Sequence, residues 1–295
     1  MMRLDPAQLD ALAAAVAEGT FDAAARTLHV TPSAISQRIK ALESSTGRVL
    51  LIRSRPIRPT EAGQALLRLA RQLQLMTSDA LDEIGADDAG TLPVVRLAVN
   101  ADSLDTWFVA ALSALDPPDP VVVFDIRRDD QERTTDLLRR GEVMAAVTSS
   151  AQAVAGCSVE RLGVMRYRPT ATRAFAARWF ADGVTPHTLE RAPVVIFDRE
   201  DQLQDAYLRR RARRALHPPR HYVPGSKAFV DAVRHGLGWG MLPDLQTEPL
   251  ADDDLVVLDA KGAVDVALYW QQWRLRSPSL DRVGAAVRAA AAAIH

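Results

Sequence analysis

Several features are scarce in this sequence of 295 residues, and each shortage excludes a class of protein. Cysteine occurs once, at Cys157, which excludes an intramolecular disulfide and any multi-cysteine zinc or iron–sulfur site. The six histidines show no HExxH or other metal-ligand spacing, so we expect neither a metal nor another cofactor. No apolar run approaches the roughly 18 residues of a membrane span. We therefore expect a soluble, globular protein with no membrane partner.

Export and catalytic signals are also missing. The first residues, MMRLDPAQLD, show no basic-then-apolar-then-small pattern, so no signal peptide is visible and we expect a cytoplasmic location. The sequence has no GxSxG elbow, no Walker loop and no convincing pair of nucleophile and base. We therefore expect no catalytic residues and no enzyme.

Charge is nearly balanced over the whole chain, with a formal net charge of -1, but it is unevenly placed. Between residues 23 and 60, seven cationic side chains stand against one acid, Glu43, so this segment has a net charge of +6 and the rest sums to -7. The seven are Arg26, Arg38, Lys40, Arg48, Arg53, Arg55 and Arg58. A basic segment on an acidic body is typical of a head that binds a polyanion, and double-stranded DNA is the expected partner.

The basic segment lies within a pattern of three short helices. Apolar residues repeat at helical spacing between Leu4 and Val16, and Gly19 ends this first helix. A second helix is predicted from Phe21 to Leu28, followed by a tight turn. Thr31 before Pro32 is an N-cap residue followed by a proline at the first helical position, which predicts the start of the third helix.

The third helix has the two faces expected of a recognition helix. Ile35, Ile39 and Leu42 recur at helical spacing and are predicted to face inward, so short hydroxyls, an amide and cations face outward. Such groups are suited to base edges and phosphates in a major groove. A plain solvated helix would show the same pattern, and the alanine-rich helix and short turn before it favour DNA binding. The expected contacts are Thr31, Pro32, Ser33, Ser36, Gln37, Arg38 and Lys40.

A two-stranded wing is predicted after this helix, in the segment RVLLIRSRPIRPTEAG that begins at Arg48. Alternation around Leu51 and a turn containing Pro56 indicate two short strands. Thr60 is a plausible N-cap of the next helix. The residues predicted to contact phosphates or the minor groove are Arg53, Arg55 and Arg58.

A long helix is predicted over residues 61–84. Its apolar residues keep a 3-4-3-4 spacing, which is typical of a coiled-coil seam. An amphipathic helix packed on its own body would give a similar stripe, but a length of about 25 residues, or ~37 Å, favours a linker that pairs with a second subunit. The chain is therefore expected to form a homodimer, possibly a tetramer. The seam residues are Leu66, Leu69, Leu73, Met76 and Ala80.

From about residue 91, apolar strands alternate with helices. The predicted order is strand 94–99, helix 100–115, strand 121–126, helix 132–140 and strand 143–148, then strand 194–198, helix 203–215, strand 221–223, helix 226–236 and a strand from residue 239. Each βαβ order predicts parallel strands covered by helices. We therefore expect two α/β lobes with a ligand cleft between them.

The run FDAAARTLHVTPSAISQRIKALESSTG, with LLIRSRPIRPTEAG and the long helix after it, resembles the DNA-binding head of LysR-type transcriptional regulators. Two body segments, RLAVNADSLDTWFVAAL from residue 96 and YVPGSKAFVDAVRHGLGWGMLPDLQ from residue 222, are similar to the branch of basic-amino-acid export regulators called LysG or ArgP, also IciA. The resemblance covers essentially the whole chain.

The resemblance implies an α+β chain in three parts. These are an all-α winged helix-turn-helix head over residues 1–60, a long linker helix over 61–90 that dimerises, and an α/β two-lobed, periplasmic-binding-protein-like effector domain over 91–295. Lobe I is expected at about 91–163 and 265–295, where the chain returns and ends in a helix from residue 279, and lobe II at about 164–264.

Candidate effector contacts stand at strand ends and helix starts, where free backbone N–H groups point into the crevice of such sheets. In the loop after the first strand, Ser103 and its neighbouring amides are expected to hold a ligand carboxylate, although helix capping explains them equally well, because Asp102 and Asp105 are spaced as a capping box. Thr148 and Ser149 end the third strand and are similarly placed, although a hydrophilic strand exit would look the same.

A lysine or arginine effector also needs an anion for its cationic end. Asp198 would supply it, although capping of the following helix is the better supported alternative. The resemblance, more than the spacing, adds the turn at Pro224 and Gly225. The expected effector contacts are therefore Ser103, Leu104, Asp105, Thr148, Ser149, Asp198, Pro224 and Gly225.

We interpret the chain as a sequence-specific DNA-binding regulator, an activator that responds to L-lysine or L-arginine and controls an amino-acid exporter gene. Aromatic residues make up only 5% of the chain, which does not favour an aromatic effector. The alternative is a broad-specificity DNA-binding protein, of the replication-initiation-inhibitor or nucleoid type, because binding could be mostly electrostatic.

Overall fold

The computed structural model describes residues 4–85, 94–115, 122–129, 131–247 and 254–294. The chain falls into two compact units. The first comprises Met1–Val99, Leu115–Val159 and Trp270–Ala285, and the second comprises Asn100–Ala114, Glu160–Tyr269 and Ala286–His295. The last part of the predicted linker, residues 86–90, and the start of the predicted body, 91–93, lie outside the described residues. Among the helices that the structure describes, none is long and apolar enough to cross a membrane.

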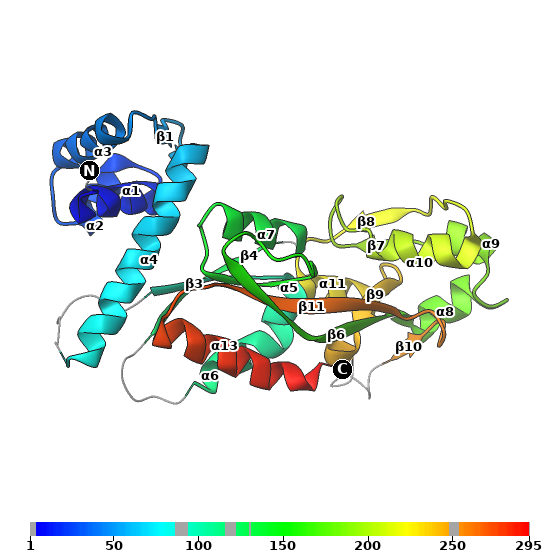
Figure 1. Cartoon of the computed structure of the whole chain (residues 1–295). Helices are drawn as coiled ribbons and strands as arrows, with labels where there is room; N and C mark the ends of the chain where they lie inside the picture. Colours follow the sequence, from blue (N-terminus) through cyan, green and yellow to red (C-terminus); the bar gives the residue numbers. More distant parts are fainter. Residues whose placement is uncertain (1–3, 86–93, 116–121, 130, 248–253, 295) are drawn as a thin grey trace. The chain divides into compact units, whose positions relative to one another are not determined.

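Three short helices and a long one build the N-terminal part of the first unit (Figure 1). They are α1 (Pro6–Glu18), α2 (Phe21–Thr27), α3 (Pro32–Thr46) and α4 (Glu61–Glu83). Each begins at a residue whose side-chain oxygen accepts a backbone N–H of the first turn, which satisfies one of the free donors at a helix start. These N-caps are Asp5, Thr20, Thr31 and Thr60. The predicted helix starts at Pro32 and after Thr60 are confirmed.

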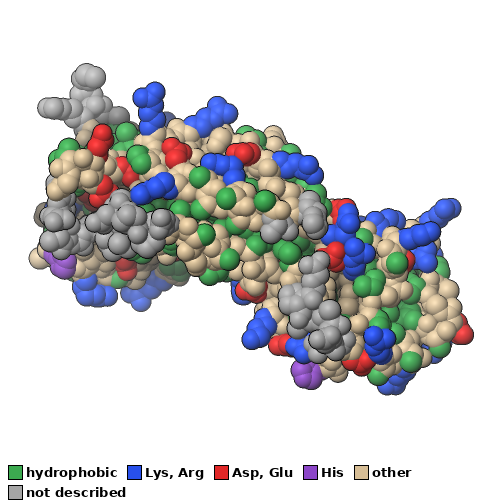
Figure 2. All heavy atoms as spheres, turned by 90° about the horizontal axis from the view of Figure 1, so that it is seen from below, with side chains coloured by type: hydrophobic (Ala, Val, Ile, Leu, Met, Phe, Trp, Pro, Cys, Tyr) green, Lys and Arg blue, Asp and Glu red, His purple; other side chains and the backbone are tan. Residues whose placement is uncertain are grey.

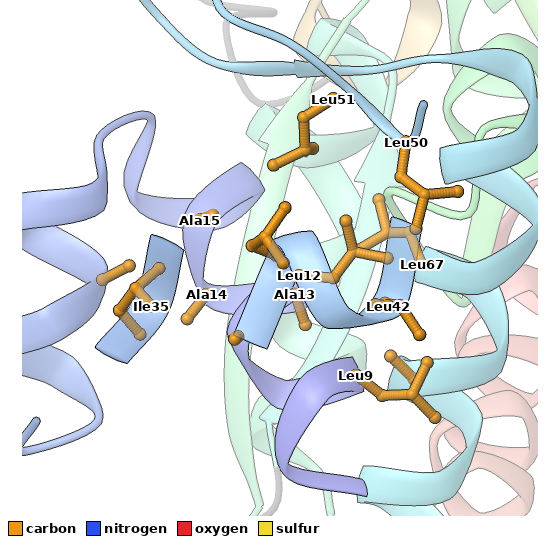
Figure 3. Close-up of a cluster of buried hydrophobic side chains, with 14 of the residues drawn as sticks. Leu9, Leu12, Ala13, Ala14, Ala15, Ile35, Leu42, Leu50, Leu51 and Leu67 are labelled. Carbon is orange, nitrogen blue, oxygen red and sulfur yellow. The ribbon is translucent and has the colours of Figure 1, made fainter. Parts of the chain in front are cut away.

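The apolar side chains of these four helices meet in one core (Figure 3). Leu12 of α1, Ile35 and Leu42 of α3 and Leu67 of α4 are fully buried in it. Burying one such side chain contributes about 1.5–3 kcal/mol. The inward face predicted for the third helix is therefore confirmed, and α4 packs on the head through its first half.

A two-stranded wing connects α3 to α4, as predicted. Strand β1 (Leu51–Ile52) pairs antiparallel with β2 (Arg58–Pro59). A Cβ on Gly63, in the first turn of α4, would lie 2.0 Å from the Leu50 carbonyl oxygen. Only glycine therefore allows α4 to begin this close to the wing.

The rest of the first unit is built on parallel strands. β3 (Val94–Val99) pairs in parallel with β4 (Val123–Arg128) and with β5 (Ala145–Thr148). α7 (Gln131–Arg139) connects β4 to β5. The parallel βαβ arrangement predicted for this part of the chain is confirmed. β3 begins where expected, whereas β4 and β5 each begin two residues later than expected. Residue 121 of the expected second strand lies outside the described residues.

The second unit combines parallel and antiparallel strands. β7 (Val194–Ile196) pairs in parallel with β8 (Arg220–Tyr222), and β6 (Cys157–Thr172) pairs antiparallel with β9 (Gly240–Pro243) and β10 (Leu255–Val257). β11 (Val264–Trp273) begins in this unit and ends in the first, and α13 (Pro278–Ala290) and the short helix η3 (Ala291–Ala293) follow it. The remaining helices are α5 (Ala101–Ser103), η1 (Leu104–Phe108), α6 (Val109–Ser113), α8 (Arg173–Trp179), α9 (Pro186–Arg191), α10 (Leu203–Ala212), α11 (Ser226–Arg234) and α12 (Asp244–Thr247).

Strand β6, the longest in the chain's described part, was not predicted. Charged side chains interrupt its apolar pattern and hide the usual strand signature. In the fold two of these charges are paired with acids, because Arg166 forms an ion pair with Asp265 at 2.7 Å and Arg168 forms one with Asp244 at 2.8 Å. The partners are distant in sequence, so no local pattern indicates them.

Candidate functional site

The outer face of α3 presents the polar side chains predicted to contact DNA. Ser33, Gln37 and Lys40 are exposed, whereas Ser36 and Arg38 are half-buried. Ile39, on the opposite face, is 1% exposed. The Thr31 hydroxyl accepts a hydrogen bond from the Ala34 N–H at 3.2 Å, so it is already engaged in starting the helix.

Four arginines follow this helix, in the segment that contains the wing. Arg48, Arg53, Arg55 and Arg58 are exposed, and none forms an ion pair with any residue that the structure describes. The single acid of the segment, Glu43, accepts the Leu50 N–H at 2.8 Å and so helps to hold the start of the wing. Unpaired arginines on one element are suited to phosphate binding. On the face seen in Figure 2, by contrast, cationic and acidic side chains are interspersed.

The predicted seam of α4 divides into two groups. Leu66 and Leu69 pack against the head core, which is an intrachain role that the spacing did not reveal. Leu73 and Met76 are 41% and 44% exposed, and Ala80 is exposed as well. The second group therefore remains available to a second subunit.

In the second unit, the carboxylate of Asp102 is the centre of a polar network. The Tyr167 hydroxyl donates to its Oδ2 at 2.7 Å, and the Ser226 hydroxyl donates to its Oδ1 at 2.6 Å. The Gln246 side-chain amide donates in turn to the Ser226 oxygen at 2.6 Å. Burial raises the pKa of Asp102, while these two hydroxyl donors act against the rise.

This network corrects the capping-box interpretation of the loop. The helix begins at Ala101 after Asn100, whose side chain makes no capping hydrogen bond. Asp102 accepts hydrogen bonds from β6 and α11 instead of the backbone of its own turn, and Asp105 is exposed. The spacing of Asp102 and Asp105 therefore does not form a capping box, because residues distant in the sequence hydrogen-bond to Asp102.

The Ser103 side chain has an unusual environment for a hydroxyl. It is fully buried, and its Oγ has no hydrogen-bond partner among the described residues. Buried polar atoms are nearly always hydrogen-bonded, so the Ser103 hydroxyl is a candidate contact for a bound ligand. The turn Leu104–Phe108 that follows is π-helical, a feature that appears frequently at functional sites. Leu104 is half-buried within it.

Two further aspartates follow strand β7. Asp198 accepts the backbone N–H groups of Glu200 at 2.7 Å and Asp201 at 2.9 Å. It therefore holds a local turn and does not cap the following helix α10, whose N-cap residue is Gln202. Asp201 accepts the Leu203 N–H at 2.9 Å. Burial raises the pKa of Asp201, and the charges of Asp198 and Asp102 act in the same direction.

Sequence reasoning missed several members of this site, namely Tyr167, Asp201 and Gln246. A signal existed for Asp201, because it follows an apolar strand within three residues of Asp198. No local signal existed for Tyr167, which lies inside the charged strand β6, or for Gln246.

The remaining predicted contacts are placed as follows. Pro224 is exposed, and Gly225 directly precedes α11, whose first residue is the buried Ser226. Thr148 and Ser149 belong to the first unit, at the end of β5, where the Thr148 hydroxyl accepts the Ser150 N–H at 3.0 Å. In the part of the chain that the structure describes, no group of three metal-ligating side chains is close enough to hold a metal ion.

The sequence matches two family descriptions. Residues 6–64 match "Bacterial regulatory helix-turn-helix protein, lysR family", and residues 89–292 match "LysR substrate binding domain". The match to the second description covers more than half of the chain.

Individual proteins agree with these matches. The chain is 44% identical over 292 residues to the lysine export transcriptional regulatory protein LysG of Corynebacterium efficiens, covering 98% of this chain and 99% of that protein. The crystal structure of ArgP from Mycobacterium tuberculosis is 47% identical, with a TM-score of 0.87 over 99% of both chains. Full-length LysG from Corynebacterium glutamicum with bound effector Arg is 38% identical, with a TM-score of 0.74 over 98% of both chains. With two family matches and relatives of this similarity over its whole length, the chain belongs to the LysR family of bacterial helix-turn-helix transcriptional regulators.

Proposed function

We propose that this regulator senses a basic amino acid, L-lysine or L-arginine, and controls a gene for amino-acid export. One observation carries the effector part of this proposal. The carboxylates of Asp102, Asp198 and Asp201 lie in the second unit without any Lys or Arg within ion-pair distance among the described residues. A half-buried acidic set with no such cation among the described residues favours a cationic ligand, because the ligand relieves the cost of desolvating the charges.

The same unit offers a partner for the other end of an amino acid. Ser103 has an unpartnered, buried hydroxyl at the start of a helical segment, where backbone N–H groups favour a carboxylate. Asp102 is its sequence neighbour, so donors and acceptors for a zwitterion come from one turn. The arginine bound to the Corynebacterium glutamicum protein and the lysine export in the name of the Corynebacterium efficiens protein support the same ligand class.

On the DNA side, we propose that Ser36, Gln37 and Lys40 of α3 face the major groove and that Arg55 and Arg58 of the wing contact phosphates. Gln37, Lys40, Arg55 and Arg58 are exposed, and the three cations form no ion pair with any residue that the structure describes, which supports this assignment. The proposed protein is a regulator and not an enzyme, and it acts in the cytoplasm, where it meets chromosomal DNA. Residues 1–60, 61–90 and 91–295 remain the proposed head, linker and effector domain.

Footprinting tests this function against general DNA coating. The full chain is titrated on the promoter region of an amino-acid exporter gene, with excess random-sequence competitor, with and without L-lysine or L-arginine. We expect a bounded footprint that survives the competitor and changes with a basic amino acid. Protection that disappears with competitor would instead support the broad-specificity alternative, which binds mainly through phosphates.

The proposed dimer contact on α4 has its own test. Leu73→Glu should yield monomers with weak operator affinity, because one head makes about half of the phosphate contacts. Leu73→Met keeps an apolar side chain and serves as the matched control. A stable Leu73→Glu dimer in sedimentation would place the subunit contact elsewhere.

A further inference from the structure

The linker helix α4 contacts the end of α7 within the first unit. The Arg71 guanidinium donates through Nη1 to the Gly141 carbonyl oxygen, and Arg68 donates through Nη1 to the Arg139 carbonyl oxygen at 3.0 Å. The last carbonyls of a helix lack intrahelical partners and carry partial negative charge. Two cations of α4 therefore bind the C-terminal end of α7.

The backbone at this contact is shaped for close approach. Gly141 has φ +68°, and a Cβ at this position would lie 2.8 Å from the Arg68 Cβ and 3.0 Å from its Cα. Glycine is therefore required both by the left-handed conformation and by the proximity of α4. The two elements meet backbone to backbone, and the arginine side chains extend this contact.

Burying the Arg71 side chain at this contact is energetically unfavourable. Its side chain is fully buried, and its Nε and Nη2 have no hydrogen-bond partner among the described residues. Burial lowers the pKa of Arg71 to about 9, and the cations Arg96 and Arg127 act in the same direction, against Glu142 and Asp125. A buried cation with unsatisfied donors adds little to stability. Such a contact is suited to forming and breaking, since its loss frees an unfavourably buried charge.

The contact lies at the beginning of a strand whose end is an expected effector contact. From Gly141 the chain enters β5, whose four residues Ala145–Thr148 are all buried. A strand of this length spans about 13 Å at ~3.3 Å per residue. Thr148 and Ser149, at its far end, are effector contacts predicted from the sequence. A buried strand of this kind can move only as a body, so a shift at one end displaces the other.

We propose that Arg68 and Arg71 form a clamp between the linker helix and the C-terminal end of α7, and that making or breaking this clamp is how the effector-binding body controls the helix that carries the DNA-binding head. The clamp itself stands on the contacts above. Its link to the effector rests on the function proposed in the preceding subsection.

Cross-linking of the full chain tests the clamp without any effector. Ala65 of α4 and Ala155 are exposed, and both line a pocket of about 630 Å³ beside Arg68 and Arg139. Cysteines at positions 65 and 155 are joined by a short bis-maleimide, and intrachain products are separated from intersubunit products by mass. Burial raises the pKa of Cys157 to about 11, so this native thiol reacts slowly.

We expect Arg71→Met to slow the intrachain cross-link several-fold and Arg68→Met to slow it less. Gly141→Ala should slow it as well, because its Cβ would push α4 away. Gly183→Ala is the matched control, since Gly183 has φ +84° but open space around it. Unchanged rates in Arg71→Met and Gly141→Ala would overturn the clamp, and the milder Arg68→Met keeps the test valid if Arg71→Met does not fold.

A second readout separates the clamp from the effector proposal. The affinity of each variant for operator DNA is measured with and without L-arginine, and the ratio is the coupling between the two sites, commonly about 5- to 150-fold in allosteric proteins. We expect clamp variants to bring this ratio toward 1, with Gly183→Ala unchanged. A clamp variant with a slowed cross-link but the ratio of the unmodified chain would overturn the transmission role. If L-arginine does not change the operator affinity of the unmodified chain, L-arginine is not the effector and the proposed transmission role falls with it. The cross-linking rates would still test whether the clamp exists.

Discussion

The head and the second unit differ in where their polar groups find hydrogen-bond partners. In the head, each of the four helix starts is satisfied by a side chain two or three residues away, and apolar side chains of all four helices form the core. In the second unit, Asp102 finds its donors 65 and 124 residues away, and Ser103 finds none among the described residues. The head is thus built from local rules, whereas the candidate effector site depends on the complete fold.

This difference matches the two tasks. A head that docks on DNA needs a rigid shape, and local caps with an apolar core provide it. A site that must respond to a ligand is suited by groups that are incompletely satisfied until the ligand arrives, at some cost to stability. Variants in the core of the head should therefore affect mainly stability, and variants in the candidate effector site should affect mainly ligand binding.

The largest effect is expected for Gly63→Ala in the head. Alanine is the better helix former by about 1 kcal/mol, so propensity alone predicts stabilisation. The added Cβ, however, would lie 2.0 Å from the Leu50 carbonyl oxygen, and wing or helix must move. We expect a net loss of roughly 3 kcal/mol, measured by denaturant unfolding of the full chain. Glu61→Ala in the same turn is the control, and a stabilised Gly63→Ala would contradict the close approach.

Asp102→Asn is expected to give the opposite profile. The neutral amide removes a buried charge, so the free energy of unfolding should stay the same or rise. Binding of L-arginine should weaken about tenfold or more, which corresponds to the loss of about 1.4 kcal/mol. Unfolding and calorimetry on the same preparation separate the two effects. A variant that is strongly destabilised but binds L-arginine normally would assign Asp102 a purely structural role.

The dependence of effector binding on pH sharpens the same contrast. The pKa values of Asp102 and Asp201 are raised above the usual 3.8, so a cationic ligand must restore their ionised forms. Affinity should be constant above the raised pKa values and fall as the pH drops through them, with proton release on binding in that window. In the same pH range, protonation of these two carboxylates as the pH falls increases the free energy of unfolding. A carboxylate in a salt bridge has the opposite effect. Titration in two buffers of different ionisation enthalpy measures the released protons, and pH-independent affinity would exclude these groups.

The smallest effect concerns two helix caps. Thr31→Ala in the head and Thr185→Ala in the second unit each remove an N-cap and should each cost about 1 kcal/mol of unfolding free energy. Only Thr31→Ala should also weaken operator binding, because Thr31 starts the helix proposed to read bases. Electrophoretic mobility shifts measure this difference, and equal operator affinities would indicate that the start of α3 tolerates a lost cap.

Sequence patterns predicted the head almost completely because its signals are local. The caps, the inward residues of α3 and the start of α4 are each set by neighbours within one turn, and the structure confirms them. The parallel strands of the body were also predicted from short apolar runs. Strand β6 was missed because charged residues interrupt its apolar pattern, and the acids that pair with Arg166 and Arg168 are distant in the sequence.

The candidate site was only partly predictable for the same reason. Ser103 and Asp198 stand next to strand ends, where a ligand is expected in any α/β fold. The Tyr167 and Gln246 members of the network are ordinary in their local context, and only the folded chain joins them to Asp102. The two roles of α4 were not predictable either. The same apolar spacing includes Leu66, which packs against the head core, and the exposed residues Leu73 and Met76.

Charge-selective effector binding is the most direct test of this account. Isothermal titration calorimetry on the full chain compares L-lysine and L-arginine with L-norleucine, which resembles lysine but lacks its cationic end. We expect both basic amino acids to bind at least about tenfold more tightly than norleucine, a difference of about 1.4 kcal/mol or more. Equal affinity for norleucine, or no binding of either basic amino acid, would contradict the proposed role of the acidic site.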